Sequence, residues 1–103
     1  MIVLHQLRRC PWAAAVRQAL ANVGVDYGTV QVPYRRDLRA EVRALTGQEL
    51  TPVLVDGEAV VAGSQRIVAH LYATYGDATQ RTRARELMGD LSPTAPPACP
   101  VGA

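Results

Sequence analysis

Cys10-Pro11-Trp12-Ala13 sets one thiol between a short β-like run and the start of an amphipathic helix. Pro11 suits the first helical position, where its missing N–H costs nothing. A thiolate at that point meets unpaired backbone N–H groups and the positive end of the helix dipole, which lowers the pKa of a thiol. Arg8 and Arg9 add positive charge just upstream. The stretch therefore indicates either a reactive cysteine or a small buried cysteine that happens to precede a helix.

Strand and helix patterns alternate on both sides of this stretch. Ile2-Val3-Leu4, followed by His5 and Gln6, predicts a strand buried on both faces. Residues 11–23 repeat apolar side chains at helical spacing and end at Gly24, a residue suited to a helix C-cap. A second strand is predicted over 27–32, before Pro33. A second helix is predicted with Asp37 near its start and Gly47 just past its end, and its apolar side is formed by Leu38, Val42 and Leu45.

The strongest local signal is a hairpin, in which residues 52–55 and 58–61 flank Asp56-Gly57. Asp-Gly is typical of a type I′ turn, whose two central residues have positive φ. Ser64 is expected to cap a third helix that runs to Tyr75. The apolar side of that helix is expected to comprise Ile67, Val68, Leu71 and Tyr75.

A fourth, weaker helix is predicted over 78–91, and a flexible tail over 92–103, where four prolines occur. The predicted domain therefore spans 1–91. In the fourth helix, Arg81, Arg83 and Arg85 are expected to be solvated, and the apolar residues are Ala84, Leu87, Met88 and Leu91.

Composition limits the classes of function. The 103 residues suffice for one domain, and the formal charge is +2 with all eleven basic residues being scattered arginines, so nucleic acid is not expected as a partner. No apolar run is long enough to span a bilayer. Cys10 and Cys99 form no CxxC and have no histidine at ligand spacing, and no signal peptide is visible. We therefore expect a cytoplasmic monomer without a disulfide framework or a metal site.

The predicted order β-α-β-α-β-β-α, the Cys10 tetrad after the first strand and Thr51-Pro52 before the hairpin together resemble the thioredoxin fold. The resemblance to glutaredoxins lies in two parts of the sequence. The first is Leu4-His5-Gln6 with the tetrad and residues 16–20, and the second is Thr51 to Gly57. Gly63 to Ile67 resembles the N-terminal, glutathione-binding domain of glutathione transferases. The resemblance covers residues 1–76. It implies an α/β, thioredoxin-like fold of the glutaredoxin type, with a small mixed four-stranded sheet and an extra C-terminal helix.

The resemblance also implies a site for glutathione. Cys10 becomes the nucleophile, and a cis Thr51-Pro52 bond turns the Thr51 backbone toward the cysteinyl residue of glutathione. The start of the third helix receives the γ-glutamyl carboxylate, and one of Arg8, Arg35 and Arg36 pairs with the glycyl carboxylate. The implied substrate-binding residues are Arg8, Pro11, Trp12, Thr51, Pro52, Gly63, Ser64 and Gln65.

Differences from the family patterns shape the functional hypothesis. Ala13 replaces the second cysteine of dithiol glutaredoxins, so a monothiol mechanism is implied, with glutathione or another low-molecular-weight thiol as co-substrate and glutathionylated proteins as partners. Pro11 and Trp12 differ from the Gly and Phe of cluster-binding relatives, so no iron–sulfur cluster is expected. Gly63 stands where transferases have Glu. The alternatives are a non-catalytic module that binds glutathione or a protein, and a redox sensor that glutathione merely caps.

Overall fold

The computed structural model describes residues 2–7, 10–33, 35, 38–47 and 51–89. The predicted domain boundary at residue 91 and the predicted tail lie outside these residues. Within the described part, every helix falls short of the length and apolar character that crossing a membrane requires. The elements in chain order are β1 (Ile2–Gln6), α1 (Pro11–Val23), β2 (Tyr27–Gln31), α2 (Ala40–Thr46), β3 (Val53–Asp56), β4 (Ala59–Ala62), α3 (Ser64–Tyr75) and α4 (Ala78–Gly89).

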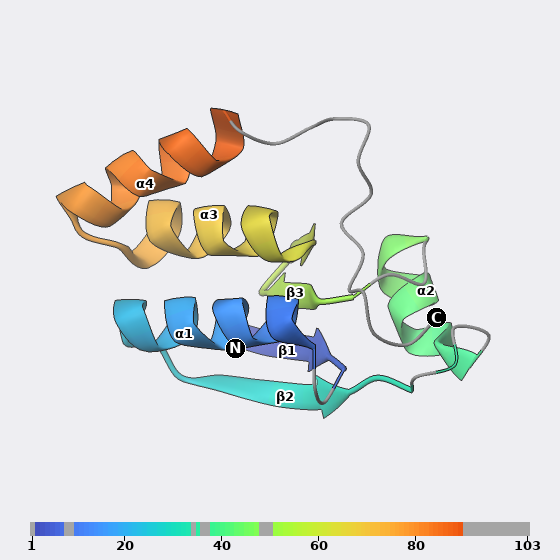
Figure 1. Cartoon of the computed structure of the whole chain (residues 1–103). Helices are drawn as coiled ribbons and strands as arrows, with labels where there is room; N and C mark the ends of the chain where they lie inside the picture. Colours follow the sequence, from blue (N-terminus) through green and yellow to red (C-terminus); the bar gives the residue numbers. More distant parts are fainter. Residues whose placement is uncertain (1, 8–9, 34, 36–37, 48–50, 90–103) are drawn as a thin grey trace.

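The four strands form one mixed sheet in the order β2-β1-β3-β4 (Figure 1). Strand β1 pairs in parallel with β2, with Leu4 opposite Thr29, and antiparallel with β3, with Leu4 opposite Leu54. Strands β3 and β4 pair antiparallel as a hairpin. The predicted thioredoxin-like α/β fold with a small mixed sheet and an additional helix after α3 is confirmed.

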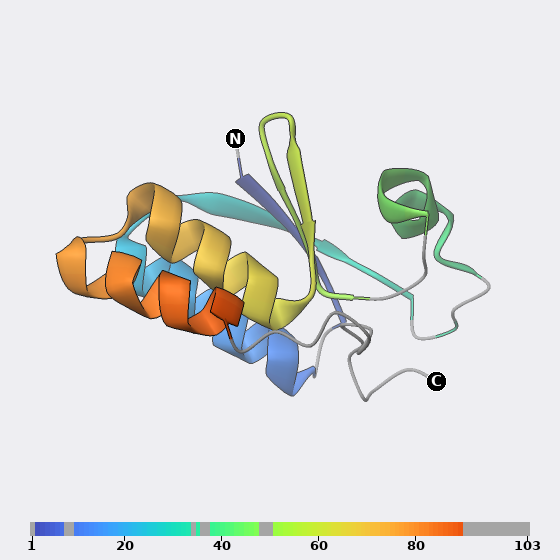
Figure 2. The same ribbon diagram turned by 90° about the horizontal axis from the view of Figure 1, so that it is seen from above.

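Two apolar clusters lie against this sheet. Successive residues of a strand point to opposite faces, and Val53 and Leu54 accordingly belong to different clusters. Leu54 packs with residues of α1 and α3, whereas Val53 shares its cluster with Val42 of α2. In Figure 2, α1, α3 and α4 lie together on one side of the sheet, and α2 stands apart on the other.

Helix α1 begins and ends as its sequence predicts. Pro11 is its first residue, after Cys10 in an extended conformation. Gly24 adopts the left-handed conformation (φ 71°) that ends the helix, and its N–H donates to the carbonyl of Leu20 at 3.0 Å. One side of the helix is buried, and it consists of Ala13, Val16, Ala19 and Leu20.

The hairpin prediction was right about the strands and wrong about the turn. Asp56 is the last residue of β3 and pairs with Ala59, so the two loop residues are Gly57 and Glu58. Gly57 has φ 60°, and no non-glycine residue in the described part has positive φ. A single positive φ at the first central residue is typical of a type II′ turn, not type I′. The physical reason is that Asp56 continues the sheet pairing and leaves the left-handed position to glycine.

Helices α2, α3 and α4 each bury fewer apolar side chains than their sequence patterns predict. Helix α2 begins at Ala40, so Leu38 precedes it and is exposed, and only Val42 of this helix is fully buried. Tyr75 is exposed at the end of α3, and Met88 is exposed on α4. Helix α4 buries Ala84 alone, and Arg81, Arg83 and Arg85 are exposed as predicted. Leu91 and Asp37 lie outside the described residues.

Candidate functional site

Cys10 occupies the N-cap position of α1, with φ −82° and ψ 123°. Its backbone carbonyl accepts the N–H of Ala14 at 3.1 Å, the first bond of the helix. The first turn of α1 holds no acidic residue that would neutralise the positive end of the dipole. The side chain is 1% exposed and is disulfide-bonded. Cys99, the one other cysteine of the sequence, lies outside the described residues, as do Arg8 and Arg9.

The Thr51-Pro52 bond is cis, as the resemblance predicted. Both residues are buried, and Pro52 directly precedes β3. The carbonyl of Pro52 accepts the N–H of Gly63 at 2.9 Å. This hydrogen bond connects the residue before β3 to the residue before α3. The buried hydroxyl of Thr51 has no hydrogen-bond partner among the described residues.

The cysteine, the cis-proline and the start of α3 lie at the same end of the sheet, here called the thiol end. One apolar cluster contains both Cys10 and Val53, the residue after the cis-proline, and Ala62 packs against it. Ala62 pairs with Val53 and directly precedes Gly63. Figure 1 shows the starts of α1, β3 and α3 together at this end. Segments far apart in the sequence are therefore brought together as the family resemblance requires.

Ser64 does not cap α3, which corrects the sequence-based expectation. The N-cap residue is Gly63, with φ 95° and ψ 137°, and its carbonyl accepts the N–H of Ile67 at 2.9 Å. Glycine adopts such a positive φ without the steric cost that a side chain would bring. Ser64 is the first residue of α3, half-buried, and helix capping does not use its hydroxyl.

The other predicted binding residues differ in their surroundings. Trp12 is 46% exposed in the first turn of α1, two residues after Cys10, so it is a surface side chain and not part of the core. Gln65 donates its side-chain amide to the carbonyl of Leu87 at 3.0 Å and thereby ties α3 to α4. Arg35 is exposed. Arg36 lies outside the described residues.

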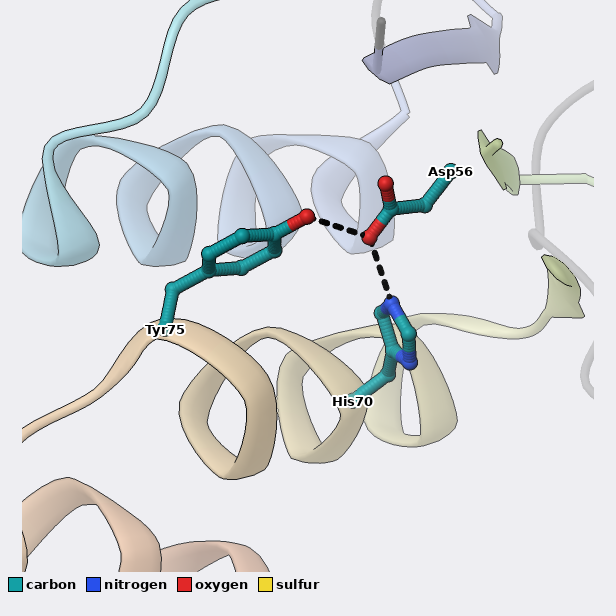
Figure 3. A network of polar contacts seen from close by, with 3 residues as sticks. All are labelled: Asp56, His70 and Tyr75. Carbon is teal, nitrogen blue, oxygen red and sulfur yellow. Dashed lines mark hydrogen bonds and ion pairs between the residues drawn. The ribbon is translucent and has the colours of Figure 1, made fainter. Parts of the chain in front are cut away.

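A polar network that the sequence did not suggest lies at the opposite end of β3, here called the Asp56 network (Figure 3). One carboxylate oxygen of Asp56 accepts the Tyr75 hydroxyl at 2.7 Å and lies 3.0 Å from Nε2 of His70. The Tyr75 hydrogen bond, followed by that of His70, lowers the pKa of Asp56 below its usual 3.8. The same hydrogen bond raises the pKa of Tyr75 above 10.0. Among the described residues, no group of three or more His, Cys, Asp or Glu side chains could hold a metal ion.

Residues 4–80 match the family model described as glutathione S-transferase, N-terminal domain. Among solved structures, the chain is similar to glutathione transferase E6 from Drosophila melanogaster, with 29% identity and a TM-score of 0.69 over 76% of this chain. It is also similar to a theta class glutathione S-transferase from Xanthomonas axonopodis pv. citri with glutathione bound, with 27% identity and a TM-score of 0.65 over 72% of this chain. A trimeric glutathione transferase from Leishmania shares the fold, at 20% identity, 85% coverage of this chain and a TM-score of 0.67.

These similarities concern a part of each transferase. The chain covers 36% of the Drosophila enzyme, 37% of the Xanthomonas enzyme and 22% of the Leishmania enzyme. No curated protein matches the sequence.

Proposed function

Because the chain belongs to the family of glutathione S-transferase N-terminal domains, we propose that it binds glutathione at the thiol end of the sheet and exchanges mixed disulfides through Cys10. The observation that carries this proposal is the juxtaposition of Cys10 at the N-cap of α1 with the cis Thr51-Pro52 segment in one buried cluster. Glutathione bound to a structural neighbour, the Xanthomonas enzyme, supports the same ligand. The proposed physiological ligand is glutathione or another low-molecular-weight thiol.

The proposed recognition of glutathione uses the backbone more than side chains. The N–H and C=O of Thr51 pair with the cysteinyl residue in the manner of an added strand. The first N–H groups of α3, at Ser64 and Gln65, face the γ-glutamyl carboxylate, since a helix N-terminus favours an anion. The hydroxyl of Ser64 is available for this contact because Gly63 takes the N-cap position.

The proposed reaction starts from reduced Cys10. Its thiolate attacks the glutathione sulfur of a glutathionylated protein, so that a Cys10–glutathione disulfide forms and the protein thiolate leaves and takes up a proton. A second glutathione, as thiolate, then attacks the glutathione sulfur of this mixed disulfide. Oxidised glutathione leaves and the Cys10 thiolate is restored. Ala13 lies where a second thiol would otherwise intervene, which is why the mechanism is written with one thiol.

A second candidate, a module that binds glutathione or a protein without turnover, is favoured by two observations. Cys10 is disulfide-bonded and 1% exposed in the structure, so its sulfur is neither free nor accessible in this form. Ala13 also removes the second cysteine that dithiol glutaredoxins use.

The test is release of glutathione from a glutathionylated model protein, measured after full reduction of the chain, alongside glutathione binding by calorimetry. Cys10→Ser is expected to abolish release and to retain glutathione binding, while the matched variant Cys99→Ser retains both. Binding by the natural chain with release no faster than in the Cys10→Ser variant would establish the binding module. Absence of both binding and release would overturn both candidates.

A further inference from the structure

The end of α4 lies at the thiol end of the sheet. Gln65, in the first turn of α3, donates its side-chain amide to the carbonyl of Leu87, in the last turn of α4, at 3.0 Å. Gly63, directly before α3, donates its N–H to the carbonyl of Pro52 at 2.9 Å. Figure 1 shows the last turn of α4 on the same side as the starts of α1 and α3. The chain therefore leaves α4 close to the cis-proline segment.

The sulfur of Cys10 is bonded to a second sulfur. The sequence has one other cysteine, Cys99, so within one molecule these two residues are the partners of the disulfide. Cys99 follows Gly89, the last residue of α4, by about ten positions, which gives the intervening chain a reach of about 33 Å at roughly 3.3 Å per residue. A link of this length suffices, because the end of α4 and Cys10 lie at the same end of the sheet.

The surroundings of Cys10 suit two different states of its sulfur. In the structure its side chain is buried in an apolar cluster with Leu7, Ala13 and Val53. A disulfide carries no charge, so its burial there lacks the desolvation cost of a buried thiolate. A released Cys10 thiolate instead faces the positive end of the α1 dipole, and the first turn of α1 holds no acidic residue. The position therefore accommodates both a buried disulfide and a solvated thiolate.

We propose that the Cys10–Cys99 disulfide is a reversible redox lock that keeps glutathione out of the thiol end until the disulfide is reduced. Cys99 takes the place that the cysteinyl residue of glutathione takes in the mixed disulfide. In both bonds Cys10 joins the sulfur of a cysteinyl residue, so the position holds either Cys99 or glutathione. The lock rests on the proposed function, because it regulates the same site.

Closing of the lock uses oxidised glutathione as the oxidant. The Cys99 thiolate attacks one sulfur of oxidised glutathione, which forms a Cys99–glutathione disulfide and releases one glutathione thiolate. The Cys10 thiolate then attacks the Cys99 sulfur and releases the second glutathione thiolate. The two protein thiols lose two electrons and two protons, and oxidised glutathione gains both and becomes two glutathione thiols. This sequence leaves a glutathione on Cys10 untouched, so it is consistent with the monothiol mechanism.

Opening is the reverse exchange and consumes two glutathione thiols. Because Cys10 is 1% exposed, an external thiolate attacks the sulfur of Cys99 and not that of Cys10. Cys10 is also the better leaving group, since the dipole of α1 stabilises its thiolate. The first glutathione therefore becomes bonded to Cys99, and the nucleophilic Cys10 thiolate is set free in the same step.

Mass spectrometry and a non-reducing gel, after treatment with excess oxidised glutathione, test the disulfide itself. The natural chain is expected to be a monomer that has lost two hydrogens, with Cys10 protected from iodoacetamide. Its rate of closing from the Cys99–glutathione disulfide should not depend on protein concentration. The matched variant Cys99→Ser is expected to retain one glutathione on Cys10, with an unchanged circular dichroism spectrum. A disulfide-linked dimer, or a natural chain that also retains glutathione on Cys10, would overturn the lock.

Calorimetric titration with S-methylglutathione, which has no thiol and cannot reduce the disulfide, tests the exclusion of glutathione. Its affinity should be at least about tenfold lower for the oxidised natural chain than for the reduced one. Reduced Cys99→Ser should bind it as the reduced natural chain does. Equal affinity in the two redox states would overturn the exclusion. Absence of binding to the reduced chain would overturn the proposed glutathione site, whereas the disulfide is still decided by mass and alkylation.

The order of opening has its own measurement. The oxidised natural chain is mixed with glutathione, quenched with acid at short times and digested, and the first glutathione is expected on Cys99. Glutathione found first on Cys10 would overturn the proposed order. In the assay of glutathione release, the oxidised natural chain should show a lag that Cys99→Ser lacks. Release without a lag would overturn the lock as a regulator of the site.

Discussion

The two ends of strand β3 carry polar chemistry of different construction. At the Pro52 end, the arrangement is made by the backbone, through a cis peptide bond, a carbonyl that accepts from Gly63 and the first turns of α1 and α3. At the Asp56 end, it is made by side chains, with a carboxylate, an imidazole and a phenol in direct contact. The protein therefore separates the proposed glutathione site, which is built on backbone geometry, from a side-chain network that joins β3 to α3.

This difference explains why the family is recognisable although side chains have changed. A contact made by a peptide group does not require a particular side chain, as the hydrogen bond between the Gly63 N–H and the Pro52 carbonyl illustrates. The side-chain network gives no such tolerance, since each of its members supplies a specific donor or acceptor. Substitutions along β3 should consequently separate effects on ligand binding from effects on stability.

The largest change in the free energy of unfolding is expected from truncating the adjacent core residues Val53 and Leu54, which belong to different apolar clusters. Leu54→Ala should lower the free energy of unfolding by about 2–5 kcal/mol, because it leaves a cavity among fully buried side chains. Val53→Ala removes less volume and should cost less. Denaturant unfolding measures both changes.

The comparison of the two variants is completed by glutathione titration at a temperature where both are folded. Val53→Ala should weaken binding, because its side chain packs in the cluster of Cys10, and Leu54→Ala should not. Equal losses of affinity would show that the thiol end depends on the whole sheet and not on its own cluster.

A smaller loss of stability is expected from a substitution at Asp56, at the other end of β3. Asp56→Asn keeps the shape of the side chain but removes the charge that accepts from Tyr75 and faces His70. The free energy of unfolding should fall by about 1 kcal/mol, a typical net value for one hydrogen bond. Disulfide exchange through Cys10 should be unchanged. A loss of exchange at equal folded population would contradict the separation of the two ends.

Much of the fold follows from local sequence patterns. Helix α1, with Pro11 at its start and Gly24 at its end, needs only spacing and cap residues to be recognised. The pairing of β3 with β4 follows from two apolar runs around Asp56-Gly57. The turn type was missed because sheet pairing extends through Asp56, and the cap of α3 was missed because Gly63 takes the left-handed position ahead of Ser64.

The candidate site divides in the same way. Cys10 became a candidate because it directly precedes a predicted helix, whereas Thr51 and Pro52 became candidates through the family resemblance. The Asp56 network could not, since its members are 14 and 19 residues apart and tertiary packing alone brings them together. The packing of α4 alongside α3 is likewise not specified by the sequence pattern of the weakly apolar fourth helix.

The pH dependence of stability should reveal the Asp56 network in acid. The pKa of Asp56 is lowered in the folded chain, so the unfolded chain binds more protons near pH 3.8. The stabilisation is therefore present above pH 3.8 and is lost as the pH falls through the lowered, folded value. Tyr75→Phe removes the largest cause of the shift and should weaken this acid dependence. Because the pKa of Tyr75 is raised, its own contribution is present below pH 10.0 and is lost as the pH rises further.

The measurement is the denaturation midpoint as a function of pH for the natural chain and the two variants Asp56→Asn and Tyr75→Phe. The curves should converge at the lowest pH, where Asp56 is protonated in both states. Parallel curves over the whole range would assign the stability change to packing and not to charge.

The smallest change in the rate of glutathione release is expected from removal of Cys99. Its thiol is the alternative to a second glutathione as the group that attacks the mixed disulfide at Cys10. Cys10 is disulfide-bonded in the structure, and Cys99 is the second cysteine of the sequence, in the proline-rich stretch 96–100 outside the described residues. Closing a long loop carries an entropic cost, prolines stiffen the arm, and free glutathione competes for the same mixed disulfide. We therefore expect Cys99→Ser, and deletion of residues 92–103, to leave the rate of glutathione release unchanged when glutathione is in excess. The assay is repeated at limiting glutathione, where an internal thiol gains most. A large loss of rate in either variant, together with a Cys10–Cys99 disulfide trapped during turnover of the natural chain, would replace the monothiol mechanism with a two-thiol one, because the resolving sulfur would then belong to the protein itself.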